Sequence, residues 1–178
     1  MIKKILTSYA NSLDEYLSSF HNQPEGLAEV GFVGNSTEVK PNKVVVSLIS
    51  IERETTGGFS APIQRAEGGY MRMTPPLQLN LNIIIAAVYD EKQYAESLSV
   101  LSDTLRFVQS MPKFEVDKIT YTIELVTLST QDINNIWTTL GGQYYPSVMC
   151  KIRRLTIDAE EIIGSGSLAE QPQVDVGS

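Results

Sequence analysis

Apolar positions along the chain change their spacing several times, and each spacing predicts a different element. From Ile2 to Phe20 they recur every three or four residues, which is the stripe of an amphipathic helix that ends before Pro24. A short strand is expected over 27–33, between two glycines. A longer buried strand is expected over Lys43–Arg53, because KVVVSLISIER is rich in β-branched residues. The first part of the chain therefore predicts a helix followed by two strands.

The segment Glu54–Pro76 shows neither a helical nor a strand period. It contains two Gly-Gly pairs and ends in Pro-Pro. A connection of this length is unusual inside a compact domain, so we expect a functional or mobile loop. Over 77–85, Leu and Ile residues then alternate with Gln and Asn at first and become continuous later. This pattern predicts a strand with a polar face at its start and two apolar faces further on.

Two helices alternate with two strands in the second half of the chain. Asp90 can cap the first helix, and Ser129 with Asp132 forms a capping box for the second, which Gly141-Gly142 ends. The strands are expected over 119–125 and 147–159. The expected buried residues are Tyr94, Leu98, Leu101, Leu105 and Val108 in the first helix, and Ile133, Ile136, Trp137 and Leu140 in the second.

This order of elements predicts an α+β fold, with a mixed, mainly antiparallel sheet of about four to five strands packed with three helices. Strands and helices alternate only in the second half, which disfavours a doubly wound fold. The domain is expected to span residues 1–163. Residues 164–178 are polar, contain Gly, Ser and Pro, and offer no core positions, so they are expected to form a flexible tail.

Composition narrows the classes of function. The 178 residues suit one domain, and a net charge of −7 argues against general affinity for nucleic acid or an anionic membrane. Polar and acidic residues from Asn11 to Glu15 interrupt any apolar core of a signal peptide, and no run of about 20 apolar residues predicts a membrane span. We therefore expect a protein that is made and folded in a cytoplasm.

A search for chemistry finds no constellation that supports catalysis. His21 is the sole histidine and stands at a predicted helix end, where a favourable charge or a hydrogen bond to the last carbonyls of its helix is expected. Cys150, the sole cysteine, falls inside a predicted strand and is expected to be a buried, small apolar residue. Asp158, Glu160 and Glu161 supply oxygen atoms without the spacing that organises a cation site. We expect no enzyme activity, no cofactor and no metal.

The basic residues of the long loop and of the end of the domain are better candidates for contact with partners than the acidic clusters are, with ordinary solvated charge as an equal alternative. Arg is over-represented in protein interfaces, and three Arg residues lie in or beside the long loop. Trp137 is assigned to the core instead, because it continues a helical stripe. The residues expected at interfaces are Arg53, Arg65, Tyr70, Arg72, Met73, Lys151, Arg153, Arg154, Val174 and Val176.

The stretch NNIWTTLGGQYYPSVMCKIRRLTID combines a short capped helix, a Gly-containing turn, an aromatic-Pro-Ser sequence and a strand. This combination resembles the cap, or tail-terminator, protein of phage-tail-like extracellular contractile injection systems of the anti-feeding-prophage type. KVVVSLISIERE, PPLQLNLNIIIAAVY and YAESLSVLSDTLRFVQSMPKF resemble further segments of that family in the same order, so the likeness covers about residues 1–159. Cys150 stands where the family usually has an aromatic residue, a mild departure that concerns packing.

The resemblance implies a tail-terminator-like fold and a structural role. The expected assembly is a homo-oligomeric ring, hexameric by that likeness, which closes the inner tube and the sheath at the end distal to the baseplate. Tube protein and sheath protein would be its partners, without nucleic acid or membrane. Assembly is expected in the cytoplasm, and the particle would then be released. The long loop is expected to meet the tube or a neighbouring subunit, and the tail to meet the sheath.

Two alternatives from other classes stay open. One is a regulatory α+β module that binds a small molecule or a peptide, with the long loop as a lid. A shift in melting temperature when a monomer binds ligand would favour it. The other is a metal-assisted hydrolase built on Asp158, Glu160 and Glu161, whose turnover would depend on metal and be lost in Asp158→Ala.

Overall fold

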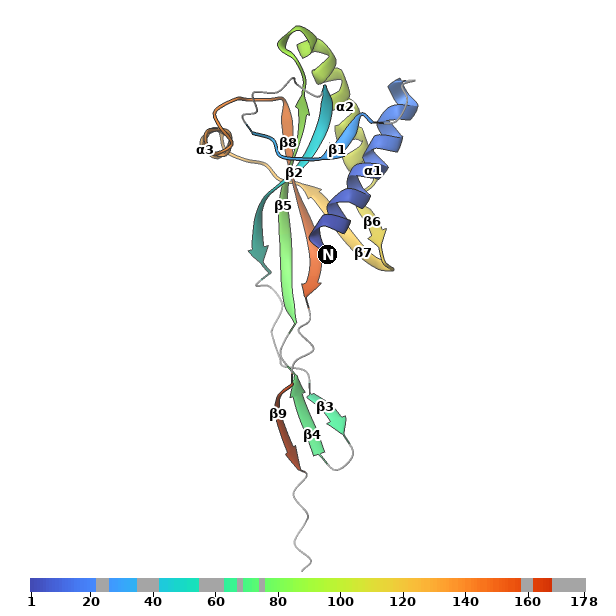
Figure 1. Cartoon of the computed structure of the whole chain (residues 1–178), viewed down its shortest axis with the longest axis vertical. Helices are drawn as coiled ribbons and strands as arrows, with labels where there is room; N and C mark the ends of the chain where they lie inside the picture. The colour runs from blue at the N-terminus through green and yellow to red at the C-terminus, as the bar shows by residue number, and fades with distance from the viewer. Residues whose placement is uncertain are drawn as a thin grey trace, which may run out of the picture. The chain divides into compact units, whose positions relative to one another are not determined.

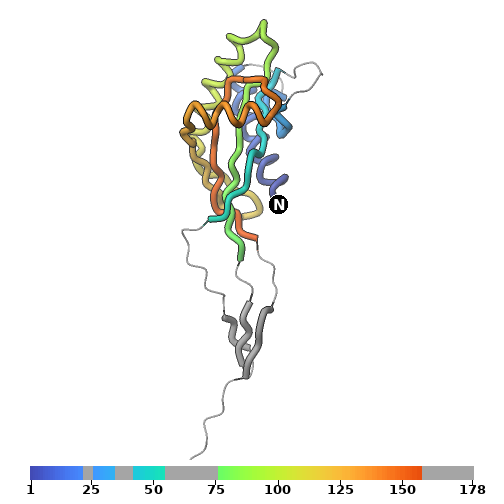
Figure 2. The backbone as a smooth tube through the Cα atoms, turned by 90° about the vertical axis from the view of Figure 1, so that its left-hand side faces the viewer, coloured from blue at the N-terminus to red at the C-terminus, as the bar shows by residue number. Residues whose placement is uncertain are grey.

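The computed structural model describes residues 1–21, 26–34, 42–54, 63–66, 69–73, 76–157 and 162–167. Two compact units divide the chain. Unit 1 comprises Met1–Glu52 and Leu79–Leu155, and unit 2 comprises Arg53–Gln78 and Thr156–Ser178. Unit 1 contains the helices and most of a six-stranded sheet, and unit 2 contains a three-stranded sheet, here called the small sheet (Figures 1 and 2).

The expected α+β class is confirmed, and the main sheet has one strand more than the upper number expected. Its strands follow the order β1-β2-β5-β8-β7-β6, and the small sheet follows β3-β4-β9. The helices are α1 (Ile2–His21), α2 (Tyr94–Ser110) and α3 (Thr130–Thr139), with a short 3-10 helix η1 (Glu91–Gln93) before α2. The strands are β1 (Ala28–Val30), β2 (Lys43–Arg53), β3 (Ile63–Ala66), β4 (Gly69–Met73), β5 (Leu77–Val88), β6 (Lys113–Val116), β7 (Ile119–Leu125), β8 (Ser147–Ile157) and β9 (Ile162–Ser167).

The main sheet is mixed but mainly antiparallel, as the sequence predicts. Strand β1 runs parallel to β2, whereas β6–β7 and β7–β8 are antiparallel pairs. The end of β2 lies beside the start of β5, because the Glu54 amide donates to the Gln78 carbonyl at 2.9 Å. The end of β5 lies beside the start of β8, because the Ala87 amide donates to the Pro146 carbonyl at 2.9 Å. Both contacts indicate antiparallel neighbours for β5.

Helices α1 and α2 cover one face of the main sheet, and α3 lies on the other side (Figure 1). The apolar stripe of α1 is buried as expected, including Tyr9, whose ring packs 5.4 Å from Phe107 of α2 and 5.0 Å from Phe114 of β6, between ring centres. These contacts bring three elements from distant parts of the sequence into one apolar core. Its other members include Leu13, Leu17, Val44, Val46, Leu81, Ile83, Ile85, Cys150, Ile152 and Leu155.

A second, smaller core lies between α3 and the opposite face of the sheet. Trp137 is only 5% exposed there, so its predicted place in the core is confirmed. The Ser129–Asp132 capping box begins α3. At its end the Gly142 amide donates to the Trp137 carbonyl at 2.7 Å and the Gly141 amide to the Thr138 carbonyl, and both glycines have positive φ. Residues that pack around Trp137 are Val33, Val45, Ile84, Ala86, Val88 and Tyr145.

Helix α2 buries a different face from the one that the sequence predicts. Tyr94, Leu98 and Leu105 are 54%, 41% and 36% exposed, so the expected stripe is wrong at these positions. Val108 is buried as expected, and the other buried residues are Ser97, Val100, Asp103, Thr104 and Phe107. Thr104 tolerates burial because its hydroxyl donates to the Val100 carbonyl at 2.9 Å. Asp90 caps η1 through the Lys92 amide, and α2 begins only at Tyr94.

The small sheet replaces much of the expected loop and the start of the expected tail. Strands β3 and β4 lie within the predicted loop and pair antiparallel, and β4 also pairs with β9, which contains Gly164–Ser167. Chain connectivity makes β3 follow β2, β4 precede β5 and β9 follow β8, so the small sheet repeats the order of the three central strands. The remainder of the predicted tail, residues 168–178, lies outside the described residues.

Helix α1 protects the β1 edge of the main sheet. The Asp14 carboxylate accepts hydrogen bonds from the amides of Gly26, at 2.9 and 3.0 Å, and of Ala28, at 2.8 Å. An unpaired amide on an edge strand is a template for unwanted strand pairing, and a carboxylate that occupies it removes that template. At the other end of α1, Lys4 forms an ion pair with Asp117 in the β6–β7 turn.

The reactivity of the Cys150 thiol can be used to test whether unit 1 is folded. Its side chain is fully buried, and burial raises the pKa of the thiol to about 12, so very little thiolate forms near pH 8. We expect no reaction of the native protein with a thiol-specific reagent at pH 8, and complete reaction in guanidinium chloride. Absorbance of the released chromophore measures both. Rapid labelling of the native protein would contradict the burial of this strand.

Truncation of Trp137 to Ala is expected to lower the free energy of unfolding by about 3–5 kcal/mol, because it leaves a cavity between α3 and the sheet. Urea denaturation measures the change. The matched control is Tyr144→Ala, which removes a 59% exposed ring in edge contact with the Trp137 ring and is expected to cost about 1 kcal/mol. Equal stability of the Trp137 variant and the wild type would show that this residue is not a core residue.

Candidate interaction surfaces

A polar cluster lies on the α3 side of the main sheet, across β2, β5 and β8. Glu52 is its centre: one carboxylate oxygen accepts from the Asn82 amide at 2.6 Å and the other from the Lys151 ammonium at 2.8 Å. Asn82 also donates to the Ser50 hydroxyl at 3.0 Å. The hydrogen bond from Lys151, followed by that from Asn82, lowers the pKa of Glu52, and the charges of Lys151 and Arg153 add to this effect. Glu52 therefore stays ionised and paired.

A second ion pair extends the charged cluster to β7. The Arg153 guanidinium contacts the Glu124 carboxylate at 2.6 and 2.8 Å. Two cations that the sequence analysis assigns to interfaces, Lys151 and Arg153, are thus bound to carboxylates of their own chain. All four side chains keep partial exposure, so each pair contributes little stability. The pairs instead make this surface nearly neutral, with alternating charge.

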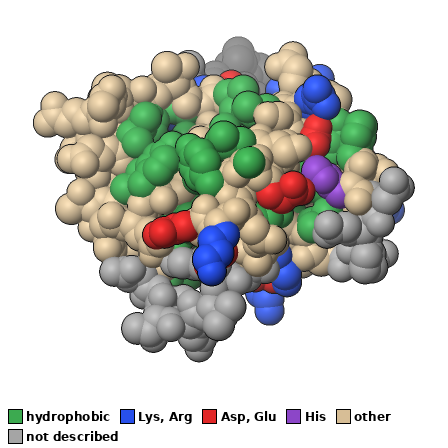
Figure 3. All heavy atoms as spheres, turned by 90° about the horizontal axis from the view of Figure 1, so that it is seen from above, with side chains coloured by type: hydrophobic (Ala, Val, Ile, Leu, Met, Phe, Trp, Pro, Cys, Tyr) green, Lys and Arg blue, Asp and Glu red, His purple; other side chains and the backbone are tan. Residues whose placement is uncertain are grey.

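An apolar groove runs beside α3. Two adjoining cavities of about 310 and 330 Å³ share Val126, Leu128, Ile136 and Met149 in their walls. The first is mostly apolar and includes Trp137, whereas the second reaches the polar cluster at Glu52 and Lys151. Four residues that line the first cavity are also exposed to a third or more: Leu105, Leu125, Ile133 and Tyr144. Hydrophobic side chains gather on one face of the molecule between charged ones (Figure 3).

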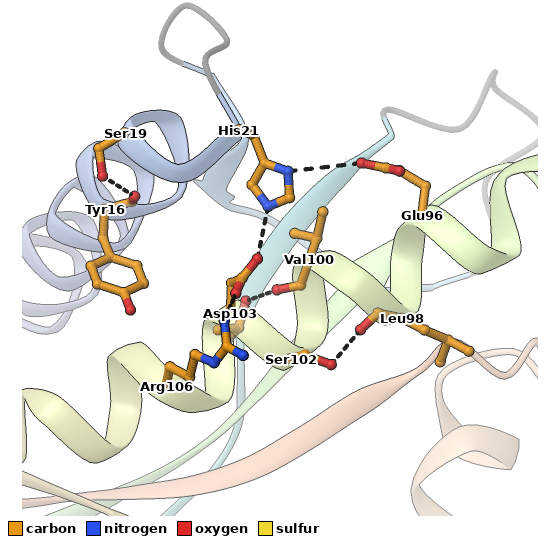
Figure 4. A network of polar contacts seen from close by, with 10 residues as sticks. Tyr16, Ser19, His21, Glu96, Leu98, Val100, Ser102, Asp103 and Arg106 are labelled. Carbon is orange, nitrogen blue, oxygen red and sulfur yellow. Dashed lines mark hydrogen bonds and ion pairs between the residues drawn. The ribbon is translucent and has the colours of Figure 1, made fainter.

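The sole histidine connects α1 to α2 (Figure 4). His21 lies 3.0 Å from a carboxylate oxygen of Asp103, and its other ring nitrogen lies 3.9 Å from Glu96. Asp103 is also bound by Arg106 at 2.8 Å. His21 stands in the last turn of α1 as expected, and its ring contacts a neighbouring helix, which the sequence does not predict. This arrangement joins two elements of the core and contains no nucleophile.

The register of the small sheet sorts its residues onto two faces. Arg65 is paired with Tyr70, and Ile63 with Arg72, so these four residues share a face. On β9, Gly166 is opposite Tyr70 and Gly164 is opposite Arg72, which places both glycines on the same face. A register shift follows Arg72, and Met73 is paired with Ile162. Three predicted interface residues, Arg65, Tyr70 and Arg72, thus come together, and Met73 is separated from them.

The other predicted residues are scattered. Arg53 ends β2, and Arg154 lies exposed in β8 with a φ of 76°, where a local irregularity lets both Ile152 and Leu155 reach the same core. Val174 and Val176 lie outside the described residues, as do the acidic residues of the candidate cation site, Asp158, Glu160 and Glu161. Within the described ranges, no group of three His, Cys, Asp or Glu residues is placed to hold a metal ion.

Sequence reasoning missed the carboxylates that neutralise the cations. The sequence analysis predicts no ion pair for Glu52 or Glu124, and it treats the Asn residues of β5 only as the polar positions at the start of a strand. A signal was present: Asn80 and Asn82 precede a continuous apolar run in β5, and both are buried in the structure. Buried amides need hydrogen-bond partners, which points to a polar cluster at this level of the sheet. Among the described helices, none has the length and hydropathy to cross a membrane.

Comparison with known proteins finds two solved structures with a similar fold. No curated protein matches the chain. A cryo-EM structure of an extracellular contractile injection system, PVC sheath/tube terminator in extended state, has a TM-score of 0.60 and 14% identity, covering 98% of this chain and 63% of that one. The cryo-EM structure of the anti-feeding prophage cap (AFP tube terminating cap) has a TM-score of 0.62 and 12% identity, covering 97% and 61%.

These two likenesses establish a shared fold, and they agree with the resemblance drawn from the sequence. The chain spans less than two thirds of the length of either solved protein. The family model described as the Pvc16 N-terminal domain matches residues 4–170, which is most of the chain. The chain therefore belongs to the family of the Pvc16 N-terminal domain.

Proposed function

We propose that this chain is the cap, or tail-terminator, domain of a contractile injection particle. The observation that carries the proposal is the likeness in fold, over 98% and 97% of this chain, to two proteins named as tube-terminating components. The family match over residues 4–170 supports the same assignment. Because the chain spans only 63% and 61% of those proteins, the activities of the whole proteins are carried over here as part of the proposal.

The proposed role is to form a ring that ends the inner tube and anchors the sheath at the end distal to the baseplate. The ring is proposed to be hexameric, made in the cytoplasm and carried into an extracellular particle. A terminator acts by binding and covering, which requires complementary surfaces and no reacting groups. The paired carboxylates and cations of the main sheet and the His21 contacts fit a structural role, because each charged group is already held by a neighbour.

The residues proposed for the contacts fall into three groups. Arg65, Tyr70 and Arg72 share one face of the small sheet, which makes them the strongest group. Lys151 and Arg153 act as pairs with their carboxylates, so a partner would meet a neutral surface there. The remaining proposed contacts are Arg53, Met73 and Arg154, together with Val174 and Val176, which are assigned to the sheath.

The comparisons give no support to the regulatory alternative. The apolar cavity beside α3 is large enough for a small ligand, yet its exposed rim is equally suited to contact with a protein. The residues of the metal-assisted hydrolase, Asp158, Glu160 and Glu161, lie outside the described residues, so that alternative stays a prediction. The likeness to two tube-terminating components supports a structural cap over both alternatives.

Growth of tubes in the presence of the chain tests the proposal. Purified tube protein from the same particle is polymerised with and without this chain, and tube lengths are measured by negative-stain electron microscopy. We expect the chain to shorten the length distribution and, when gold-labelled, to lie at one end of each tube. Unchanged lengths with label spread along the tubes would contradict terminator function. An unrelated acidic protein at the same concentration serves as the control.

A further inference from the structure

The main sheet ends in two edge strands, β1 and β6. On β1, the Leu27 carbonyl accepts a hydrogen bond from β2 and the Gly31 amide donates one to it, so the odd-numbered residues bond toward that strand. Because backbone groups alternate in direction along a strand, the Ala28 carbonyl, both groups of Val30 and the Phe32 amide point away from the sheet. Among the described residues, none donates to or accepts from these outward groups.

The Asp14 carboxylate occupies only the beginning of this edge. It accepts from the amides of Gly26 and Ala28. Val30 and Phe32 follow along the edge, and their side chains are 39% and 78% exposed. An edge with unpaired backbone groups and exposed apolar side chains is a template for a further strand. The second half of the β1 edge is therefore suited to strand addition.

The β6 edge presents the complementary backbone groups. The Ile123 amide of β7 donates to the Pro112 carbonyl at 2.9 Å, so the even-numbered residues of this segment bond toward β7. The amide and the carbonyl of Lys113, and those of Glu115, therefore point away from the sheet. Within the described part of the chain, no hydrogen bond reaches them. Both edges thus offer donors and acceptors at the spacing of a strand.

The two edge strands run in the same direction along the main sheet. β1 is parallel to β2, and the pairs β2–β5, β5–β8, β8–β7 and β7–β6 are antiparallel. Four reversals leave β6 parallel to β1. One copy can therefore continue the sheet of another through a parallel pair of edge strands, without reversing the direction of either copy.

The side chains of the two edge strands are sorted onto the same two faces of the sheet. Val30 is paired with a β2 residue of the core under α1 and α2, and Phe114 packs against that core. Glu29 is paired with a β2 residue of the core under α3, so it lies on the other face, as does Lys113, which alternates with Phe114.

This sorting distinguishes the two possible directions of pairing. A parallel alignment of the outward groups places Val30 beside Phe114 and Glu29 beside Lys113, so each face continues from copy to copy. An antiparallel alignment of the same groups would place Val30 opposite Lys113 or Glu115. The face under α1 and α2 in one copy would then meet the opposite face in the next copy, which rotation about a ring axis does not produce.

We propose that β1 of one copy pairs in parallel with β6 of the next copy, so that neighbouring main sheets form one continuous sheet. The proposal rests on the ring of the proposed function, and it supplies the heterologous contact, between two different surfaces of one chain, from which a closed ring is built. Its partner surface is a second copy of this chain, because the two free edges complement each other in backbone groups, direction and side-chain faces.

One alignment uses every outward group on both edges. The Lys113 amide donates to the Ala28 carbonyl, and the Lys113 carbonyl accepts from the Val30 amide. The Glu115 amide donates to the Val30 carbonyl, and the Glu115 carbonyl accepts from the Phe32 amide. The Ala28 amide, already bound to α1, is not needed. This alignment also places the carboxylate of Glu29 beside the ammonium of Lys113, an opposite-charge pair between neighbouring strands.

A proline at the β6 edge tests the backbone contact in the full chain. Glu115→Pro removes an outward amide, so β6 keeps its bonds to β7 and loses one proposed bond to the next copy. We expect sedimentation velocity to show association weakened by about tenfold or more. Glu115→Ala is the matched control and is expected to associate as the wild type does. Circular dichroism and protection of the Cys150 thiol report whether both variants are folded.

Disulfide cross-linking tests the alignment. Cys150 is the sole cysteine and is fully buried, so introduced cysteines report alone. Glu29→Cys/Lys113→Cys is oxidised with and without tube protein and resolved on a non-reducing gel. We expect a ladder of covalent oligomers that ends at the size of the ring, because residues side by side on neighbouring strands are within reach of a disulfide. Glu29→Cys/Thr120→Cys, with its second cysteine one strand further from the edge, is expected to give no ladder.

Three results would overturn the inference. The first is the absence of a ladder both with and without tube protein. The second is a disulfide dimer formed by Glu29→Cys or by Lys113→Cys alone, which would show pairing of like edges. The third is a folded Glu115→Pro variant that associates as well as Glu115→Ala.

Tube growth separates failure of this contact from failure of the proposed function. A chain that shortens tubes while its Glu29→Cys/Lys113→Cys variant gives no ladder refutes the contact and leaves the terminator role standing. A ladder from a chain that leaves tube length unchanged supports the contact and refutes the terminator role.

Discussion

Burial of β5 from both sides is the constraint on which the layered arrangement depends. Alternate residues of this strand, such as Ile83 and Ile85, face the core under α1 and α2, whereas Ile84 and Ala86 face the core under α3. A strand that is apolar on both faces has to lie inside a sheet and between two layers. The order β2-β5-β8 and the helices on opposite sides follow from this requirement, with β5 at the centre.

The sequence predicts the elements better than it predicts which side of an element is buried. The α3 capping box and its Gly-Gly end are local signals, and the structure reproduces both. In α2, by contrast, Tyr94, Leu98 and Leu105 follow a regular helical spacing and yet face outward. The buried face contains Thr104, whose hydroxyl donates a hydrogen bond to a backbone carbonyl of the same helix. The spacing of apolar residues along a helix does not show whether the face that they form is buried or exposed.

Contacts between segments that lie far apart in the sequence cannot be predicted from local sequence patterns. Strand β6 pairs with β7 through a turn whose central residues, Asp117 and Lys118, both have positive φ, and this dipeptide is a weak turn signal compared with Asn-Gly. The pairing of β4 with β9 joins a predicted loop to a predicted tail. The sequence identified the cations of the candidate surfaces, but only the structure shows which of them are neutralised and which share a face with Tyr70.

Three covalent connections join the main sheet to the small sheet, because β2, β5 and β8 each continue toward one of its strands. A tensile load applied to the small sheet is therefore divided among three backbones instead of one. Where antiparallel strands are pulled along their length, the hydrogen bonds between them lie across the direction of pull and resist shear together. Force applied to the small sheet would thus reach the core of the main sheet through three strands, β2, β5 and β8, each of which has residues buried there.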